Sequence, residues 1–378
     1  MTQEQMTARC WAEIDLDIVR DNYRSARAMS GGALLIPVLK ADAYGLGAAK
    51  VAKVLKAEGA GLFAVAEYLE AEEILDAAGA DVLVMGVVPD AFLESAVMRG
   101  IVATLVDLRQ ARLLNETAAR CRKPARAHIK LDTGLHRLGF SPEEAVSAAR
   151  EIIMMPHVRI EGLFTHLALR SRTQDDLQIA RLVSVADALR AEGLDYGMLH
   201  ALDSIGMCLY PEYRFDAVRA GTWLYGAWHP SFPPDGCRLA VRLRARIVQV
   251  RTVPAGECLG YDSEHPLARD SVIATVACGY YDGIPRANAC GCAVVRGARA
   301  PIAGLVMMDQ MTLDVTGIPG VRPGDAATLY GDGISLLEAS KWYGVNRNEL
   351  IVRLSRRVKR VYAGGREEIP GALPLDLA

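Results

Sequence analysis

Short apolar runs alternate with amphipathic stretches over the first two-thirds of the chain. The runs are apolar without interruption, which predicts strands buried on both faces, as in a parallel sheet. The stretches between them predict helices, most clearly at residues 143–152 and 174–192, and Ser141 followed by Pro142 marks the start of the first. The eight predicted strands are residues 34–40, 62–67, 82–88, 101–108, 127–132, 160–167, 198–204 and 218–225.

Eight strand–helix units within roughly 200 residues predict an α/β fold, a (β/α)8 TIM barrel, which we assign to residues 12–232. A doubly wound open sheet is the alternative architecture. It is less favoured because no Gly-x-Gly-x-x-Gly motif follows the first predicted strand.

The pattern changes at residues 230–236, where prolines, an aspartate and a glycine predict a linker. The chain beyond is turn-rich and strand-like, which predicts a second, mostly antiparallel β domain over residues 233–378. Residues 1–11 are expected to associate with it, and the apolar run at 10–16 to pair with it. Its predicted strands are residues 239–253, 271–278, 293–298, 300–315 and 325–331, and its predicted helices are 336–342 and 347–354.

Composition narrows the class of protein. The chain of 378 residues has a net charge of −2 and no basic patch of the kind that binds nucleic acid. No secretory signal and no apolar stretch long enough to span a membrane is visible. The eight cysteines are scattered, and Cys290 and Cys292 have no second ligand pair nearby. We therefore expect reduced thiols, a cytoplasmic location and no metal site.

Polar residues end several of the predicted barrel strands, and barrel enzymes place their active sites there. A lysine at such an apolar mouth can be desolvated, which lowers its pKa and lets the neutral amine form an imine with an aldehyde. Hydroxyls and a small-residue turn suit a phosphate. Taken singly, each residue is explained as well by a strand cap or a turn. The set comprises Lys40, Tyr44, Lys130, Arg137, His166, Ser204, Arg219, Gly221 and Thr222.

The stretch Val38-Leu-Lys40-Ala-Asp-Ala-Tyr44-Gly-Leu-Gly47 closely resembles the cofactor-lysine motif of the alanine racemases. Residues 130–140, Lys-Leu-Asp-Thr-Gly-Leu-His-Arg-Leu-Gly-Phe, resemble the second motif of that family. Further matches follow in the family's order, and together they cover nearly the whole chain from Trp11 to about Tyr362. They are Thr165-His166, Ser204, Arg219-Ala-Gly221, Leu224-Tyr225-Gly226, Tyr280-Tyr-Asp282-Gly283 and Met308-Asp309-Gln310.

The resemblance implies a pyridoxal 5′-phosphate (PLP) enzyme that racemises a small amino acid, L-alanine to D-alanine for the cell wall. It also implies a head-to-tail homodimer with shared active sites. Lys40 would hold the cofactor and act as base on one face of the substrate. Tyr261 of the other subunit would be the base on the opposite face, since racemisation needs a proton donor or acceptor on each side.

The same resemblance gives roles to the other residues. Arg219 would face the pyridine nitrogen and leave it unprotonated, because arginine keeps its proton. His166 would stack beside the ring, Arg137 and the Met308 amide would bind the substrate carboxylate, and Lys130 would be carbamylated. Phosphate and entrance contacts are expected from Tyr44, Ser204, Gly221, Thr222 and Tyr280.

Several positions depart from the family pattern. Arg356 stands where a phosphate-contacting tyrosine is usual, and Leu305 and Ser171 stand where an entrance arginine and carboxylate are usual. Asp203 replaces asparagine, and the catalytic tyrosine lies in Gly260-Tyr261-Asp262. Arg356 could still bind phosphate.

The departures leave two readings open: unchanged alanine activity, or a racemase of altered or broad specificity for serine or for larger or charged amino acids. A PLP decarboxylase of the same barrel class and a non-enzymatic PLP-binding protein remain alternatives.

Overall fold

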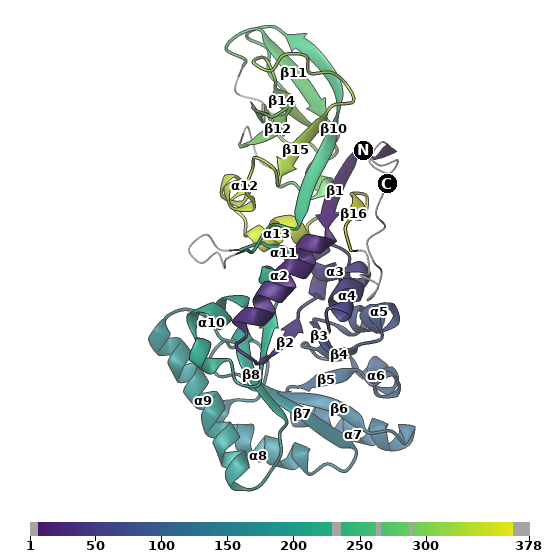
Figure 1. The fold of residues 1–378 in the computed structure, drawn as a ribbon, viewed down its shortest axis with the longest axis vertical. Coiled ribbons are helices and arrows are strands. Elements are labelled where there is room, and N and C mark those ends of the chain that lie inside the picture. Colours follow the sequence, from purple (N-terminus) through teal and green to yellow (C-terminus); the bar gives the residue numbers. More distant parts are fainter. Residues whose placement is uncertain (1–6, 229–235, 262–265, 287–289, 366–378) are drawn as a thin grey trace, which may run out of the picture.

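The computed structural model describes residues 7–228, 236–261, 266–286 and 290–365, and the predicted linker at 230–236 lies almost wholly outside them, as does Asp262. Two sheets organise these residues (Figure 1). The first has eight strands in the order β2-β9-β8-β7-β6-β5-β4-β3. Parallel bridging of Val38 to Ala64 joins its two ends, so the sheet closes and the predicted TIM barrel is confirmed.

The barrel strands are shorter than the apolar runs that predict them. The first ends at residue 37 rather than 40, and the last at 220 rather than 225. The end of the last run forms the short, mostly buried helix α11 (Thr222–Tyr225), and apolar periodicity alone does not separate a buried strand from a buried helix. The strands are β2 (Leu34–Pro37), β3 (Leu62–Val65), β4 (Asp81–Val84), β5 (Val102–Leu105), β6 (Ala125–Lys130), β7 (Val158–Phe164), β8 (Met198–Asp203) and β9 (Ala217–Ala220).

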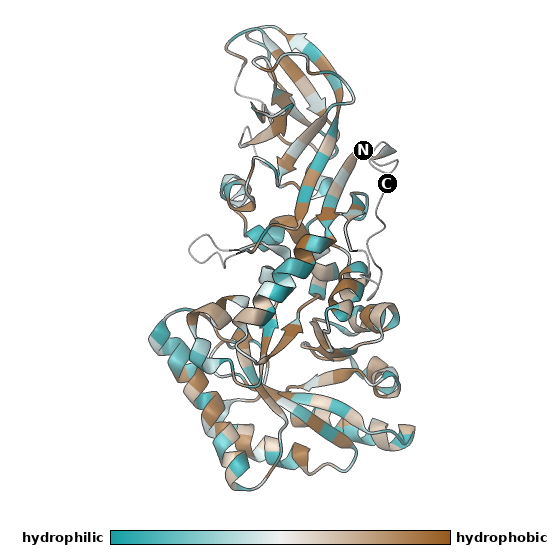
Figure 2. Ribbon diagram, in the orientation of Figure 1, coloured by the Kyte–Doolittle hydropathy of each residue, from teal (hydrophilic) through white to brown (hydrophobic). Residues whose placement is uncertain are grey.

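Amphipathic helices surround the barrel, and Figure 2 shows both hydrophilic and hydrophobic residues on them. Helix α8 begins one residue before its predicted range, after Ser141 and with a proline in its first turn. The helices are α2 (Leu16–Met29), α3 (Lys40–Gly45), α4 (Ala48–Ala57), α5 (Tyr68–Ala78), α6 (Leu93–Arg99), α7 (Leu108–Cys121), α8 (Pro142–Ile153), α9 (Arg172–Ala191), α10 (Ser204–Leu209) and α11 (Thr222–Tyr225).

The second sheet is mostly antiparallel, and β1 (Cys10–Asp15) pairs within it with β10 and β16, as the apolar run at 10–16 predicts. The single strand predicted at 300–315 is wrong, because β13 ends at Pro301 and a turn through Gly304 separates it from β14. The last strand, β16, begins with two consecutive charged residues, Lys359 and Arg360, and is absent from the prediction. The other elements are β10 (Val241–Val253), β11 (Ser271–Val276), β12 (Cys292–Val295), β13 (Ala298–Pro301), β14 (Met311–Asp314), β15 (Ala326–Tyr330), β16 (Lys359–Ala363), α12 (Leu336–Tyr343) and α13 (Arg347–Val352).

Within the described parts of the chain, no helix is long and apolar enough to cross a membrane. The eight cysteines are all free thiols. No group of three or more His, Cys, Asp or Glu side chains that could hold a metal ion occurs among the described residues.

Candidate active site

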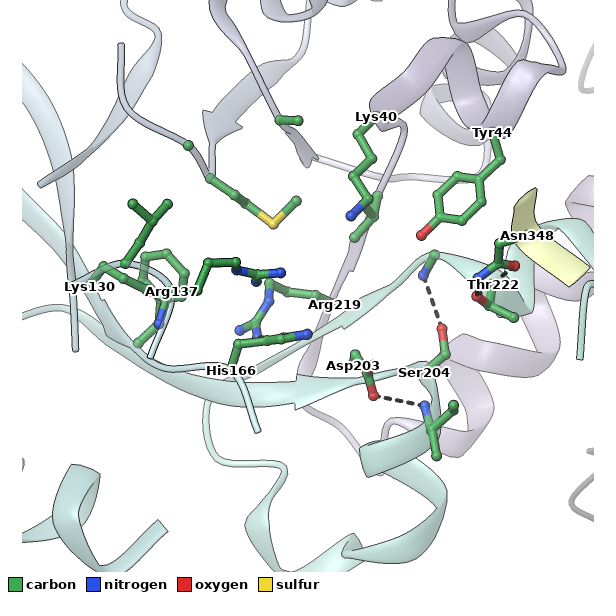
Figure 3. A pocket seen from close by; sticks show the side chains of 18 residues that line it. Lys40, Tyr44, Lys130, Arg137, His166, Asp203, Ser204, Arg219, Thr222 and Asn348 are labelled. Carbon is green, nitrogen blue, oxygen red and sulfur yellow. Dashed lines mark hydrogen bonds between the residues drawn. The ribbon is translucent and has the colours of Figure 1, made fainter. Parts of the chain in front are cut away.

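A cavity of about 430 Å³ opens among the residues that follow the barrel strands. Its size falls in the usual range of small-molecule sites, ~300–1,000 Å³. Four cationic side chains line it, Lys40, Lys130, Arg137 and Arg219, against the single carboxylate of Asp203 (Figure 3). This excess of positive charge favours an anionic ligand. The other predicted residues that line the cavity are Tyr44, His166, Ser204, Gly221 and Thr222.

Lys40 begins α3, which is a left-handed turn. Four consecutive residues, Ala41 to Tyr44, have φ between 51° and 57°, and none is glycine. For L-amino acids this conformation costs roughly 1–2 kcal/mol per residue, so the surrounding structure must hold it. The Gly47 amide donates to the carbonyl of Asp42 (2.9 Å), whose side chain accepts the Ala48 amide (2.7 Å).

The turn is also packed tightly against the C-terminal part of the chain. A Cβ at Gly45 would lie 2.5 Å from the carbonyl oxygen of Ile351, and one at Gly47 would lie 2.0 Å from the hydroxyl of Tyr362. Both glycines have positive φ as well. Both positions therefore require glycine, because the C-terminal part of the chain approaches them too closely for a Cβ atom. The tight packing of the turn fixes the direction of the Lys40 side chain.

Burial lowers the pKa of Lys40 from its ordinary value, and the Arg137 guanidinium lowers it further. The carboxylates of Glu70 and Asp203 oppose that shift. A depressed pKa increases the neutral fraction of the amine near pH 7, which is the form that attacks an aldehyde or accepts a proton.

Hydrogen-bond donors gather at the other end of the cavity. Ser204 Oγ accepts the amides of Gly221 (3.0 Å) and Trp223 (3.4 Å), which leaves its own proton to donate. A Cβ at Gly221 would lie 2.5 Å from the Tyr44 hydroxyl, so only glycine admits that hydroxyl. Asn348 Nδ2, from α13, donates to Thr222 Oγ1 (3.0 Å). Three hydroxyls and an amide side chain thus face a region suited to a phosphate.

Arg219 is buried at the base of the cavity. Its Nη2 donates to the carbonyls of Thr165 (2.9 Å) and Ala201 (2.8 Å) and contacts His166 Nδ1 (3.2 Å). Its Nη1 contacts His200 Nδ1 (2.6 Å). Burial lowers the pKa of Arg219 to about 10, which still leaves it charged near neutrality.

Because Arg219 only donates, His166 and His200 must accept through Nδ1 and carry their protons on Nε2. Burial first, and the Arg219 charge second, lower the pKa of His166 to about 3, so its ring is neutral. His200 Nε2 then donates to His128 Nδ1 (3.0 Å). A chain of two neutral imidazoles therefore lies behind Arg219, and the ring of Phe164 stacks on His200.

Lys130 is buried beside these cations, and its Nζ donates to the carbonyl of Leu131 (2.7 Å). Burial, with the Arg219 and Arg137 charges, lowers the pKa of Lys130 to about 7, while Asp132 opposes the shift. The neutral form of this amine is therefore far more accessible near pH 7 than in an ordinary lysine.

Six predicted site residues do not line this cavity. Tyr261, Met308 and Tyr280 lie in the second domain with 69%, 52% and 38% of their surface exposed, and Leu305 lies beside Gly260 in that region. A second hollow of about 570 Å³ is lined by Gly260, Met307 and neighbouring strand residues. Ser171 caps α9 by accepting the Gln174 amide, and Arg356 is exposed.

Sequence reasoning missed Asn348, His128 and a role for His200. A histidine inside an apolar buried strand is itself a signal, because buried polar groups require partners. Asn348 carries no such signal, since it lies on a short polar helix that only the tertiary fold brings to the cavity. Asp203, a departure from the expected asparagine, accepts the amides of Ile205 (3.0 Å) and Gly206 (2.9 Å), a capping role in which the two residue types are nearly equivalent.

Comparison with known proteins adds to this geometry. Residues 14–229 match the family profile "Alanine racemase, N-terminal domain", and residues 240–362 match "Alanine racemase, C-terminal domain". An alanine racemase of Carboxydothermus hydrogenoformans is 36% identical over 366 residues, which are 93% of this chain and 99% of that protein. A solved alanine racemase from Clostridium difficile 630 has a TM-score of 0.90 at 31% identity, covering 94% and 96% of the two chains. One from Bartonella henselae with covalently bound pyridoxal phosphate has a TM-score of 0.87 at 27% identity, covering 94% and 100%.

Proposed function

This chain belongs to the alanine racemase family, and from that premise we propose that it is a racemase that interconverts L-alanine and D-alanine with PLP as its cofactor. The observation that carries the proposal is the barrel cavity, where the low-pKa amine of Lys40 lies among cationic groups and hydroxyl donors. The same cavity supports a small amino acid as substrate, because its volume must also hold the cofactor.

The residues present fit PLP. Ser204, Thr222, Tyr44 and Asn348 supply donors for a phosphate, and Arg219 is the buried donor at the opposite side of the cavity. A single carboxylate, Asp203, lines the site, and its oxygen is engaged by backbone amides. When bound, PLP supplies an aldehyde for the amino group and a conjugated ring that stabilises negative charge at Cα.

Lys40 and Tyr261 divide the proton transfers between them. The Nζ of Lys40 would hold the cofactor covalently in the resting protein and, as the free amine, would take or return the Cα proton on one face. The hydroxyl of Tyr261 does so on the other face. Since Tyr261 is exposed and lies outside the cavity of its own chain, it acts in the site of a second copy. The proposal therefore includes a homodimer with two shared sites.

The remaining side chains orient the ligands. Arg219 would donate to the ring nitrogen without protonating it, which would limit charge delocalisation and so disfavour side reactions. Arg137 binds the substrate carboxylate together with the Met308 amide of the second copy. His166 packs beside the ring. Carbamylation of Lys130 would replace a repulsive cation by an anion between Arg137 and Arg219.

Altered specificity finds no support among the cavity residues of this chain. Ser171 serves as a helix cap, and Arg356 is exposed rather than in the cavity. We therefore propose alanine as the preferred substrate and cell-wall D-alanine as the product's use.

Deuterium incorporation at Cα in D2O, measured for L-alanine, L-serine, L-lysine and L-glutamate, tests this function. We expect incorporation with loss of optical activity for alanine, at a kcat/KM more than about 100-fold above the others. Preference for another amino acid would establish the altered specificity instead. Release of carbon dioxide would indicate a decarboxylase, and holoprotein that exchanges none of them would indicate a PLP carrier.

A further inference from the structure

We propose that Glu70 of α5 is a positioning residue for Lys40: its carboxylate fixes the amide that follows the lysine and so sets how Lys40 enters the cavity. For its kinetic consequences, this inference rests on the proposed function.

The carboxylate of Glu70 joins three segments of the chain. One oxygen accepts the amide of Ala41 (2.5 Å), the residue after Lys40. The other accepts the amides of Ala66 (2.8 Å), just beyond β3, and Glu67 (3.3 Å), at the start of α5. Glu70 therefore connects the first two barrel units at the point where Lys40 leaves the sheet.

The Ala41 amide needs such a partner. Ala41 is the first residue of this turn with left-handed φ and ψ angles, and the first amides of any helical turn have no acceptor within that turn. The far end of the turn is held by the C-terminal strand, where Arg360 Nε donates to Gly45 O (3.1 Å) and Tyr362 Oη donates to Leu46 O (3.1 Å). Glu70 provides the corresponding restraint at the end that carries Lys40.

A helix-capping role does not account for both oxygens. Glu70 and Glu67 form a capping box at the start of α5, which uses the Glu67 amide. The oxygen that binds Ala41 contributes nothing to that box. Its partner belongs to a different strand–helix unit, so the contact acts on Lys40 and its turn.

The charge of Glu70 acts on Lys40 as well. The charged groups that face Lys40 are Arg137, which lowers its pKa, and Glu70 and Asp203, which raise it. Removal of the Glu70 charge leaves Arg137 less opposed. The pKa of Lys40 should then fall further below its ordinary value.

Glu70→Gln tests the inference, with Glu72→Gln as its matched control on the same helix. Glu72 accepts the Tyr68 hydroxyl (2.6 Å), a contact on another face of α5. In cofactor-free protein we expect Glu70→Gln to speed amide hydrogen exchange at residues 41–44 by about tenfold, the scale of a lost charged hydrogen bond. We also expect the pH midpoint for acylation of Lys40, followed by peptide mass, to shift downward. In holoenzyme, kcat for alanine should fall about tenfold while KM changes less than about threefold.

Glu67→Ala separates positioning from helix capping, because it removes the capping-box partner and leaves the Ala41 contact in place. If Glu67→Ala reproduces every effect of Glu70→Gln, or if Glu70→Gln matches Glu72→Gln in exchange and in pH midpoint, the inference is overturned. The exchange and acylation measurements need neither cofactor nor substrate. They therefore remain decisive even if the protein proves to racemise no alanine.

Discussion

The barrel mouth and the exposed face of the second domain are built in opposite ways. At the mouth, Lys40, Lys130 and Arg219 are wholly or partly buried, and burial, together with the nearby Arg137 charge, lowers the pKa of each. On the second-domain face, Tyr261 and Met308 project outward with most or half of their surface exposed. In the proposed function, Lys40 at the mouth transfers the proton on one face of the substrate, and a group from a second copy serves the opposite face. Tyr261, the proposed second proton-transfer group, is exposed on this face and does not line the barrel cavity of its own chain.

The exposed face is nevertheless rigidly supported. Asp282 is fully buried and accepts Arg357 Nε (2.7 Å), Arg9 Nη1 (3.2 Å) and the Gly279 amide (2.9 Å). The neighbouring amides of Tyr280 and Tyr281 donate to the carbonyls of Met307 (2.9 Å) and Met308 (3.1 Å). An exposed set of side chains on such a fixed support is what a site completed by a second copy requires. In the proposed dimer, residues at the barrel mouth therefore bind the cofactor and substrate, and residues on the second-domain face of the other copy supply the second proton-transfer group.

The largest effect should follow Lys40→Ala. This change removes both the covalent anchor and one proton-transfer group, so we expect racemase activity to fall by more than about 10⁴-fold. The absorbance of bound cofactor at its visible maximum should be lost as well. Lys53→Ala, an exposed lysine on α4, is the control and should leave both unchanged. Retention of more than about 1% of activity by Lys40→Ala would contradict the assigned role.

Tyr261→Phe should be nearly as damaging, but in a different way. The variant keeps the ring and loses the hydroxyl that transfers the proton, so we expect activity to fall by about 10²–10⁴-fold. Cofactor affinity should stay within about twofold of the parent protein, because Tyr261 does not line the barrel cavity. Equilibrium titration with PLP measures that difference directly.

Mixing the two inactive variants tests whether the regions come from different copies. In co-expressed Lys40→Ala and Tyr261→Phe protein, half of the dimers are mixed, and one of their two sites has both groups. About one quarter of the parent activity should therefore return. Activity no higher than that of the two separate variants would show that each chain serves its own cavity.

Asp282→Asn should destabilise the second-domain face and leave the barrel mouth unchanged. Loss of the buried charge leaves Arg9 without this carboxylate and Arg357 with Asp309 alone, and because both guanidinium groups are partly exposed we expect a loss of about 1.5–3 kcal/mol of unfolding free energy. We expect KM for alanine to rise about tenfold with cofactor affinity nearly unchanged. Asp309→Asn is the control, because Asp309 is exposed and its pair with Arg357 is worth less than about 1 kcal/mol. If Asp282→Asn weakened cofactor binding by the same factor as it raised KM, the second-domain face would not act separately from the barrel mouth.

The sequence predicts the mouth better than the face, for physical reasons. Continuous apolar runs identify the barrel strands, and nine predicted residues at or beyond the ends of those strands, eight of them polar, line one cavity. The left-handed turn is unpredictable from pattern, because its positive φ values fall on Ala41 to Tyr44 and not on glycines. The strand predicted at 300–315 runs through a turn at Gly304, since apolar residues continue on both sides of it. Asn348 reaches the cavity because α13 packs against α3, where the Asn348 Nδ2 donates to Thr222 Oγ1 of α11.

The protonation state of Lys130 should have the smallest effect. The direction of the resulting change in stability with pH follows from the pKa of Lys130. The folded value of about 7 lies below the ordinary 10.5, so the unfolded chain binds more protons between those pH values. Without carbon dioxide, the protein should therefore lose stability as pH falls from about 10 to about 7, with no further loss below. The neutral amine that forms above pH 7 reacts with carbon dioxide to give a carbamate, which converts repulsion from Arg219 and Arg137 into attraction.

At pH 8, bicarbonate should accordingly raise the melting temperature of the parent protein and increase kcat/KM by about threefold over carbon dioxide-free buffer, which corresponds to about 0.7 kcal/mol. Lys130→Met fills a similar volume without an amine, so its melting temperature and its activity should not respond to bicarbonate. Equal responses of the two proteins would mean that bicarbonate acts elsewhere. No response in either would mean that Lys130 stays a free amine, held neutral by burial, and that the mouth tolerates its cations without a bound anion.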